Sequence, residues 1–388
     1  MQPNKIIDLE QARHTIRRKK PLGEISIMRV FSMFAVIAIH FLNIPVSQVL
    51  VGSKGHGNFF MLRSMLVFAV PSFLFVSMMM LTYGLDGKKL DVLDLYKKKF
   101  VRIAIPYLLW SAAYQFILIL TGNVEPAKIL NPKSISYLLL YGKSYEHLYF
   151  MIILLELFLV APILIPIARK VKDSWTSAIA IAFGTQMVIY VLNRFYIRDH
   201  FTMIQSTFLW YFSIAFIGLW FGCNYERNLK TVQRHQNKLF IALALSGIIY
   251  SYYSRLLWQQ MWNEVVFDTF FYTLDLHLYM LLCTLGSLLI AKWVVSYPID
   301  PMGRKKRSYR FFMWLSPLTY GIYLMHPGLT YLVRKLIESR SSFLWTLVVA
   351  CGVPLTAALC GKITEWMQDI PVLSLAFGNG LIPKKKKA

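Results

Sequence analysis

Ten apolar stretches, each 16 to 24 residues long, are separated along the chain by short polar segments. An α-helix rises about 1.5 Å per residue, so about 20 apolar residues span the hydrocarbon core of a bilayer. The pattern predicts an all-α fold, a polytopic transmembrane helical bundle of about ten helices embedded in lipid. The expected spans are residues 25–44, 60–83, 101–121, 148–168, 175–192, 207–223, 239–254, 269–291, 311–332 and 343–363.

Composition and charge support this prediction and orient the bundle. Of the 388 residues, 56% are hydrophobic and only 16% are charged, which is more apolar than a soluble fold of this length requires. The formal net charge of +23 would suit nucleic acid, but the basic residues cluster between the apolar stretches. Loops on one side of the predicted membrane, with the termini, hold 30 of the 42 lysines and arginines, and loops on the other side hold 11. The positive-inside rule therefore predicts cytoplasmic termini, and no nucleic-acid partner is indicated.

These patterns divide the chain into three regions. Residues 1–23 are a basic cytoplasmic N-terminal segment, residues 24–366 the transmembrane domain, and residues 367–388 a cytoplasmic basic tail. The four cysteines lie in or beside apolar stretches, without the spacing of a disulfide framework or a metal site. We therefore expect no bound metal.

The first apolar stretch carries two residues that are costly in hydrocarbon, Arg29 and His40. Eleven residues at about 100° each bring a helix back to within about 20° of its starting face, so both side chains share one stripe. They lie about 16 Å apart along the helix axis. Ionisable residues inside membrane helices usually mark a pathway or a reaction site. The structural alternative is that Arg29 reaches the lipid headgroups and His40 bonds to a neighbouring helix.

This pair suits a long anionic ligand that enters from the cytoplasm. The forked guanidinium of Arg29 matches phosphate, and His40 exchanges protons near neutral pH. The spacing is comparable with an extended phosphopantetheine arm, so an acyl-CoA would leave its phosphates near Arg29 and present its thioester at His40. Lys99 and Arg102, at the start of the third stretch, extend the basic surface, although the positive-inside bias alone accounts for such residues.

Further ionisable and aromatic residues fall in the outer half of the predicted membrane, where His40 also lies. They are His147, Tyr149 and Glu156 in the fourth stretch, Asp275 in the eighth, and Tyr323 and His326 in the ninth. Each ionisable group taken singly is explained by a hydrogen bond between helices. Because several stretches place such groups in the same outer half, the set favours a common site.

These motifs resemble those of the acyltransferase-3 family of bacterial integral-membrane acyltransferases, over about residues 22–365. The most specific motif is an arginine, ten residues and a histidine in the first span, met here by Arg29 and His40. Supporting segments lie at 70–77, 97–106, 147–150 and 319–326. Two positions depart from the family pattern. Met78 stands where glycine is usual, which would thicken a close helix contact, and Tyr149 stands where tryptophan is usual.

The resemblance implies an O-acyltransferase of the bacterial plasma membrane with no permanently bound cofactor. Its donor would be an acyl-CoA, commonly acetyl-CoA, and its acceptor a carbohydrate or lipid-linked glycan. His40 would be the general base and Arg29 would bind the donor, a role that Lys99 and Arg102 would share. A carboxylate behind His40 would hold its tautomer, with Glu156 and Asp275 as candidates from their depth. His147, Tyr149, Tyr323 and His326 would support the site or face the acceptor.

A polysaccharide exporter or flippase is the main alternative, since many spans and buried ionisable groups also suit a transporter. A sugar pathway, however, has no need for an imidazole aligned with a phosphate clamp, and no inverted repeat is visible in the sequence. A scaffold would leave the cost of the buried ionisable groups unexplained. The sequence therefore favours an enzyme.

Overall fold

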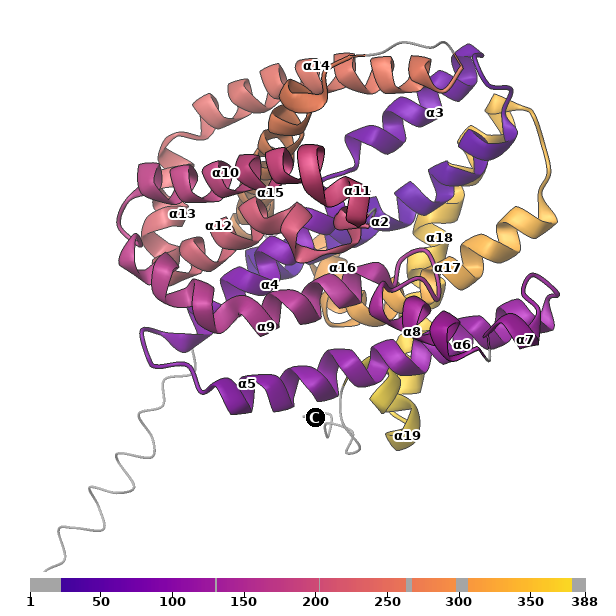
Figure 1. Ribbon diagram of the computed structural model, residues 1–388, viewed down its shortest axis with the longest axis horizontal. Coiled ribbons are helices and arrows are strands. Elements are labelled where there is room, and N and C mark those ends of the chain that lie inside the picture. Colours follow the sequence, from indigo (N-terminus) through magenta and orange to yellow (C-terminus); the bar gives the residue numbers. More distant parts are fainter. Residues whose placement is uncertain (1–21, 130, 202, 263–266, 298–305, 379–388) are drawn as a thin grey trace, which may run out of the picture.

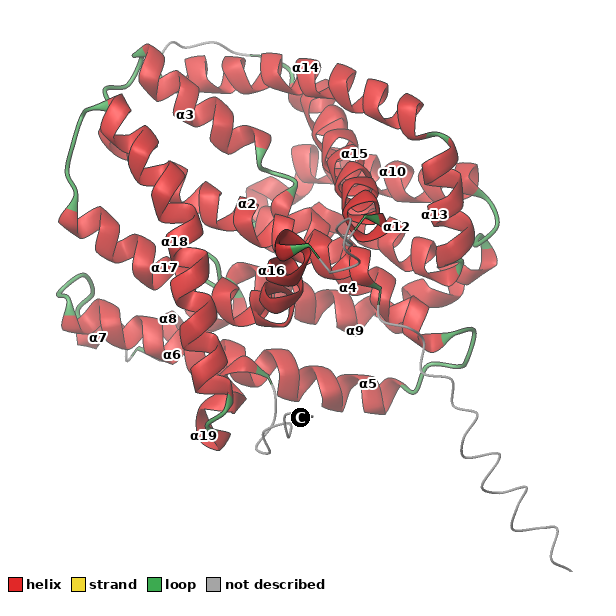
Figure 2. Ribbon diagram, turned by 180° about the vertical axis from the view of Figure 1, so that it is seen from behind, coloured by secondary structure: helices red, strands yellow, loops and turns green. Residues whose placement is uncertain are grey.

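The computed structural model describes residues 22–129, 131–201, 203–262, 267–297 and 306–378. The basic segment expected at 1–23 lies almost wholly outside this part of the chain, and so do the lysines at 384–387. Within it, every regular element is a helix, which confirms the expected all-α bundle. Figure 2 shows the helices joined by short loops.

The longer helices run at different tilts through one bundle. They are α2 Gly23–Gln48, α3 Lys54–Met65, α4 Ala69–Leu85, α6 Ile105–Leu120, α9 Tyr149–Lys170, α10 Trp175–Leu192, α12 Phe212–Cys223, α14 Gln236–Gln260, α15 Thr269–Ser296, α17 Thr319–Leu336 and α18 Ser342–Gln368. The shorter ones are α5 Val92–Lys99, α7 Pro126–Ile129, α8 Pro132–Leu140, α11 Arg198–His200, α13 Tyr225–Arg234, α16 Arg307–Leu315 and α19 Pro371–Ser374. Two π-helical turns are η1 Phe100–Ala104 and η2 Asn193–Ile197, and the 3-10 turns are η3 Ile204–Ser206, η4 Phe208–Tyr211, η5 Ser316–Leu318 and η6 Leu375–Phe377.

Eight helical segments of the described chain are long and apolar enough to cross a membrane. Two of the ten expected spans have a different form. The stretch expected at 207–223 forms η4 and α12, and α13 then turns away by 109°; counting this bent pair as one span gives nine. The stretch expected at 311–332 is interrupted by η5, where Pro317 lacks a backbone donor, so α16 and α17 are separate helices.

Helix α2 lies in the interior of the bundle and packs against α3, α4, α15, α17 and α18. In Figure 1, α14 follows one edge of the molecule, α5 and α6 follow the opposite edge, and α2 and α4 lie between them. A helix that is apolar on nearly every face is stable only where neighbours surround it. Accordingly Ile27, Met28 and Phe41 of α2 are fully buried. The few polar residues of α2 are thereby carried into the interior.

The contact between α4 and α12 is unusually close. Gly218 and Gly222 of α12 face α4, and a Cβ atom at Gly218 would stand 2.6 Å from the backbone oxygen of Phe75. The hydroxyl of Thr82 donates to the backbone oxygen of Leu219 at 2.7 Å. Met78, expected to thicken a helix contact, instead packs against Gly218 and is fully buried. The small residues that let these backbones approach come from α12 rather than from α4.

The chain after α18 folds back against the bundle. The indole Nε1 of Trp110 donates to the backbone oxygen of Ala376 at 2.9 Å, and the buried ring of Phe377 lies 6.1 Å from that of Trp110. Gly378 adopts a positive φ of 70° and lies against the backbone of Arg102. The described part of the tail expected at 367–388 therefore packs against α6 and η1.

Candidate active site

Three imidazole rings converge near the C-terminal half of α2. His40 of α2 lies 4.9 Å from His326 of α17 and 6.5 Å from His147, which precedes α9; His147 and His326 are 5.7 Å apart, all between ring centroids. His147 and His326 are fully buried, whereas the side chain of His40 retains 13% exposure. The structure therefore brings together three of the histidines that the sequence placed in the outer half of the membrane, and His40 is the one that a substrate can reach.

A carboxylate completes this imidazole cluster. Oε2 of Glu146 lies 3.4 Å from Nδ1 of His40. The hydrogen bond to His40 is the main cause that holds the pKa of the Glu146 carboxyl below its ordinary value, and the charges of Arg334 and Arg63 act in the same direction. Because an ionised carboxylate only accepts hydrogen bonds, it favours the tautomer of His40 with the proton on Nδ1. Nε2 of His40 is then free to accept a proton.

Hydrogen bonds fix the side chain of His326 and the backbone of His147. Nδ1 of His326 lies 3.2 Å from the backbone oxygen of Ile322, so it carries the proton, and Nε2 is a buried acceptor without a partner among the described residues. The hydroxyl of Tyr323 donates to the backbone oxygen of His147. Burial lowers the pKa of His147, which lies in the loop before α9, well below its ordinary value of 6.5. His147 is therefore a neutral neighbour of His40.

Arg29 lies on a large basic cavity at the other end of α2. This basic cavity has a volume of about 850 Å³. Its cationic lining residues are Arg29, Lys88, Lys89, Lys98, Lys99 and Arg102, and its acidic ones are Asp91 and Asp94. Lys98 pairs with Asp94 at 2.6 Å, and Nζ of Lys99 lies 3.6 Å from the ring centroid of Phe158. The remaining cations make the cavity suitable for a polyanion of the size of a nucleotide cofactor.

The acidic residue of α2, Glu24, is paired with side chains other than Arg29. Glu24, just over one turn earlier on α2, accepts from the hydroxyl of Tyr225 at 2.9 Å and from Nζ of Lys292 at 3.3 Å. Within the described chain, Arg29 itself forms no ion pair. Arg102 reaches the same cavity from the π-helical turn η1, a local widening of the helix that is frequent at functional sites. The cavity wall extends as far as Arg29 and Ser77, and His40 lies about 16 Å further along α2.

A second cavity, lined mainly by aromatic and polar side chains, adjoins His40. This aromatic cavity has a volume of about 590 Å³, and its wall includes Ile39, the residue before His40, and Tyr149. Arg63 of α3 is its cationic lining residue. Tyr149, which stands where tryptophan is usual in the family, therefore lines this cavity. In the sequence, nothing distinguishes Arg63 or Glu146 from other charged residues of the loops.

A comparison with families of known sequence matches the acyltransferase-3 family, described as an acyltransferase domain, over residues 22–364. The chain belongs to the acyltransferase-3 family. The match covers most of the chain and includes Arg29, His40 and every residue of the imidazole cluster. Comparisons with curated proteins and with solved structures found no match. The protein is therefore an acyltransferase with several membrane-spanning helices.

Two carboxylates favoured from the sequence lie elsewhere in this acyltransferase. Oε2 of Glu156 accepts from the backbone N–H of Phe208 at 2.7 Å, at the start of η4. Oδ1 of Asp275 accepts from the hydroxyl of Ser246 at 2.7 Å and so joins α15 to α14. Both bonds tie one helix to another, and the carboxylate beside His40 is Glu146. Among the described residues, no group of three or more His, Cys, Asp or Glu side chains is arranged to hold a metal ion.

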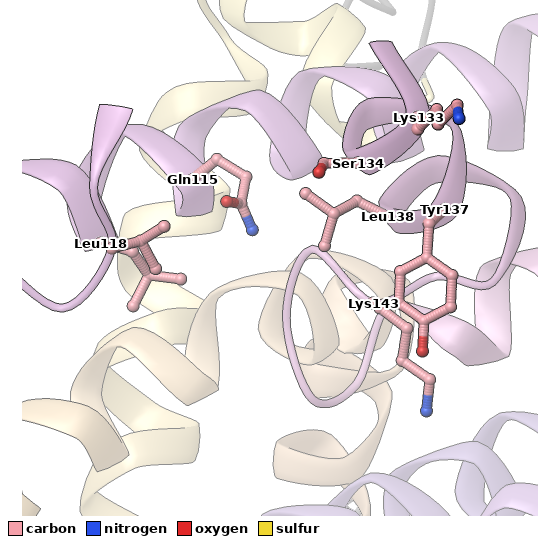
Figure 3. A pocket seen from close by; sticks show the side chains of 8 residues that line it. Gln115, Leu118, Lys133, Ser134, Tyr137, Leu138 and Lys143 are labelled. Atoms are coloured by element: carbon pink, nitrogen blue, oxygen red, sulfur yellow. The ribbon is translucent and has the colours of Figure 1, made fainter. Parts of the chain in front are cut away.

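A third pocket of about 490 Å³ lies between α6 and α8, away from the imidazole cluster. Figure 3 shows Lys133, Ser134, Tyr137 and Leu138 of α8 on one side, Gln115 and Leu118 of α6 on the other, and Lys143 in the loop that follows α8. Nε2 of Gln115 donates to the backbone oxygen of Ser144 at 2.7 Å, two residues before Glu146. The contact links this pocket to the loop that positions Glu146.

Proposed function

We propose that this acyltransferase moves an acetyl group from cytoplasmic acetyl-CoA to a hydroxyl of a carbohydrate or lipid-linked glycan, in the plasma membrane of a bacterium. The observation that carries the proposal is that one buried helix, α2, bears Arg29 on a basic cavity and His40 beside a carboxylate. A family that transfers acyl groups needs a donor site and a proton acceptor within reach of each other.

The basic cavity supports acyl-CoA as the donor. Its volume of about 850 Å³ falls in the range of pockets that hold small cofactors. Arg29, Lys99 and Arg102 supply the charge that binds phosphates, and the pantetheine arm then follows α2 toward His40. The basic loops of the sequence face the cytoplasm in this arrangement, where acyl-CoA is found.

His40 acts as the general base in this proposal. Nε2 of His40 takes the proton of the acceptor hydroxyl, and the oxygen attacks the thioester carbonyl. The carbon–sulfur bond breaks, and the leaving thiolate receives the proton from the imidazolium. Glu146 keeps Nδ1–H oriented and stabilises the transient cation, in the manner of an orienting residue behind a base. Only the two substrates are consumed, and the side chains of His40 and Glu146 return to their starting state.

Reconstitution in proteoliposomes tests the proposal. Radiolabelled acetyl-CoA is supplied only to the face that carries the termini, and an accepting glycan extract only to the other face. Labelled ester should accumulate on the glycan, and none should form when the two substrates are exchanged between the faces. Passage of unmodified glycan without label would instead support the exporter.

A further inference from the structure

The aromatic cavity beside His40 has a lining suited to sugars. Six of its lining residues combine an aromatic ring with a polar group: Tyr149, Tyr190, Trp210, Tyr211, Tyr250 and Tyr272. Rings of this kind present apolar faces together with hydrogen-bonding edges. Pockets that bind small molecules typically pair such surfaces with a few convergent polar groups. Asn193 and Gln205 add amide groups to the wall.

Arg63 gives this cavity a positive charge. The lining residues include Arg63 but no carboxylate, lysine or histidine of the described chain. Nε of Arg63 is buried without a hydrogen-bond partner among the described residues, and so is Oδ1 of Asn193, the first residue of the π-helical turn η2. A buried N–H without a hydrogen-bond partner is costly, and a ligand that accepts from Nε of Arg63 removes that cost.

The cavity also reaches the part of α2 that carries His40. Ile39, which directly precedes His40, forms part of its wall, and so does Tyr149, two residues after His147. The charge of Arg63 contributes to the field at Glu146, after the larger effect of the hydrogen bond between Glu146 and His40. A ligand that reaches Arg63 is therefore held close to the base.

We propose that the aromatic cavity is the acceptor subsite and that it selects an acceptor bearing an acidic group, on its sugar or on its lipid carrier, which binds the guanidinium of Arg63. This inference rests on the proposed function for its assignment to the acceptor. A carboxylate on the sugar and a phosphate on its lipid carrier have the shared chemistry that a guanidinium fork recognises. Tyrosines and amides around Arg63 then bind the sugar hydroxyls and ring.

Calorimetric titration of the full chain in detergent tests this subsite. The probes are digalacturonate, its neutral counterpart digalactose of the same linkage, farnesyl phosphate and its neutral counterpart farnesol. We expect at least one anion to bind more tightly than its neutral counterpart. Arg63→Gln should lower the affinity for that anion about 10- to 100-fold, as expected for loss of a hydrogen bond to a charged group. Arg63→Lys should retain part of the affinity, and Arg198→Gln, an exposed arginine on α11, should leave it within about twofold.

The pattern of binding separates the sources of the acidic group. Preference for digalacturonate identifies an acidic sugar, and preference for farnesyl phosphate identifies a carrier phosphate. The inference is overturned if neither anion binds better than its neutral counterpart, or if Arg63→Gln and Arg198→Gln have equal effects. It is also overturned if Arg63→Gln lowers kcat for acidic and neutral acceptors alike without raising KM, because Arg63 would then act only through Glu146.

Parallel titration with acetyl-CoA keeps this test distinct from that of the proposed function. If acetyl-CoA fails to bind but an anion binds through Arg63, the donor assignment falls and the subsite stands. If acetyl transfer proceeds and Arg63→Gln leaves acceptor affinity unchanged, the subsite falls and the proposed function stands.

Discussion

Oε2 of Glu146 lies 3.4 Å from Nδ1 of His40, although one residue belongs to a loop and the other to the buried helix α2. The pair has the geometry of a base and the group that orients it, with the second imidazole nitrogen left to face a substrate. Glu146 is more than half exposed, so the ion pair by itself contributes little to stability. Its effect is on the tautomer and direction of His40.

Replacing His40 tests whether its imidazole is the base. His40→Gln keeps one hydrogen bond and similar bulk but cannot accept a proton near neutral pH. We expect kcat for acyl transfer to fall about 10²- to 10⁴-fold, and His40→Ala to be equally impaired. Both variants should insert and fold, as gel filtration in detergent will show. A Gln variant that retains most of the activity with both substrates saturating would exclude His40 as the base.

Glu146→Gln tests the orienting role of the carboxylate. The amide keeps the shape but can present N–H to Nδ1, which favours the wrong tautomer. We expect kcat to fall about 10- to 100-fold, the equivalent of one charge-assisted hydrogen bond, with KM for the donor unchanged. Asp199→Asn, at an exposed acid of α11, serves as the control. Equal effects of the two substitutions would show that general surface charge, and not orientation, is responsible.

Arg29→Lys separates donor binding from chemistry. Lysine keeps the charge but lacks the bidentate fork that matches phosphate. We expect the Kd for acetyl-CoA to rise about 10-fold while a substantial part of kcat remains, because hydrogen bonds to a charged group are lost only in part. Equilibrium binding and saturation kinetics measure the two effects. Unchanged donor affinity with a lost rate would assign Arg29 to the transition state.

The burial of His147 predicts a pH dependence of stability. Because burial lowers the pKa of His147 in the folded protein, the unfolded chain binds the proton more readily. The contribution of His147 to the free energy of unfolding is therefore complete above the ordinary histidine pKa of about 6.5. As the pH drops below that value, the free energy of unfolding falls, by at most about 1.4 kcal/mol per pH unit for this group. Thermal unfolding in detergent between pH 8 and pH 5 measures the slope. His147→Gln should have a shallower slope, and an identical slope would contradict the prediction.

The sequence predicted the helices and part of the active site, because apolar length and depth along a helix are local properties. Arg29 and His40 could be placed on one stripe from helical geometry alone. His326 could be placed near the depth of His40 from its distance to the helix end, and His147 at the outer face of the membrane. The interruption of the ninth expected span by η5 was not predicted, although Pro317 marks it in the sequence.

Lateral neighbours could not be predicted in the same way. Most spans are apolar on every face, so periodicity does not indicate which helix each one touches. Glu156 and Asp275 have suitable depths but bind η4 and α14, whereas Glu146 reaches His40 from a loop that carries no periodic signal. Arg63 likewise looked like one more charge near a membrane surface. Only the packing of α3 beside α2 shows that Arg63 faces a cavity.

The contact of α4 with the glycines of α12 also constrains how the protein is made. The segment from α5 to α10 separates the two helices, so at about 5–20 residues per second α12 leaves the ribosome on the order of ten seconds after α4. Until then the wall of α4 that holds Phe75 and Met78 has only lipid or earlier helices to cover it. In the two-stage view of membrane folding, α4 inserts first as an independent helix and is captured later. Closure of the bundle thus waits for the synthesis of α12, and a chain truncated before α12 would leave α4 uncaptured.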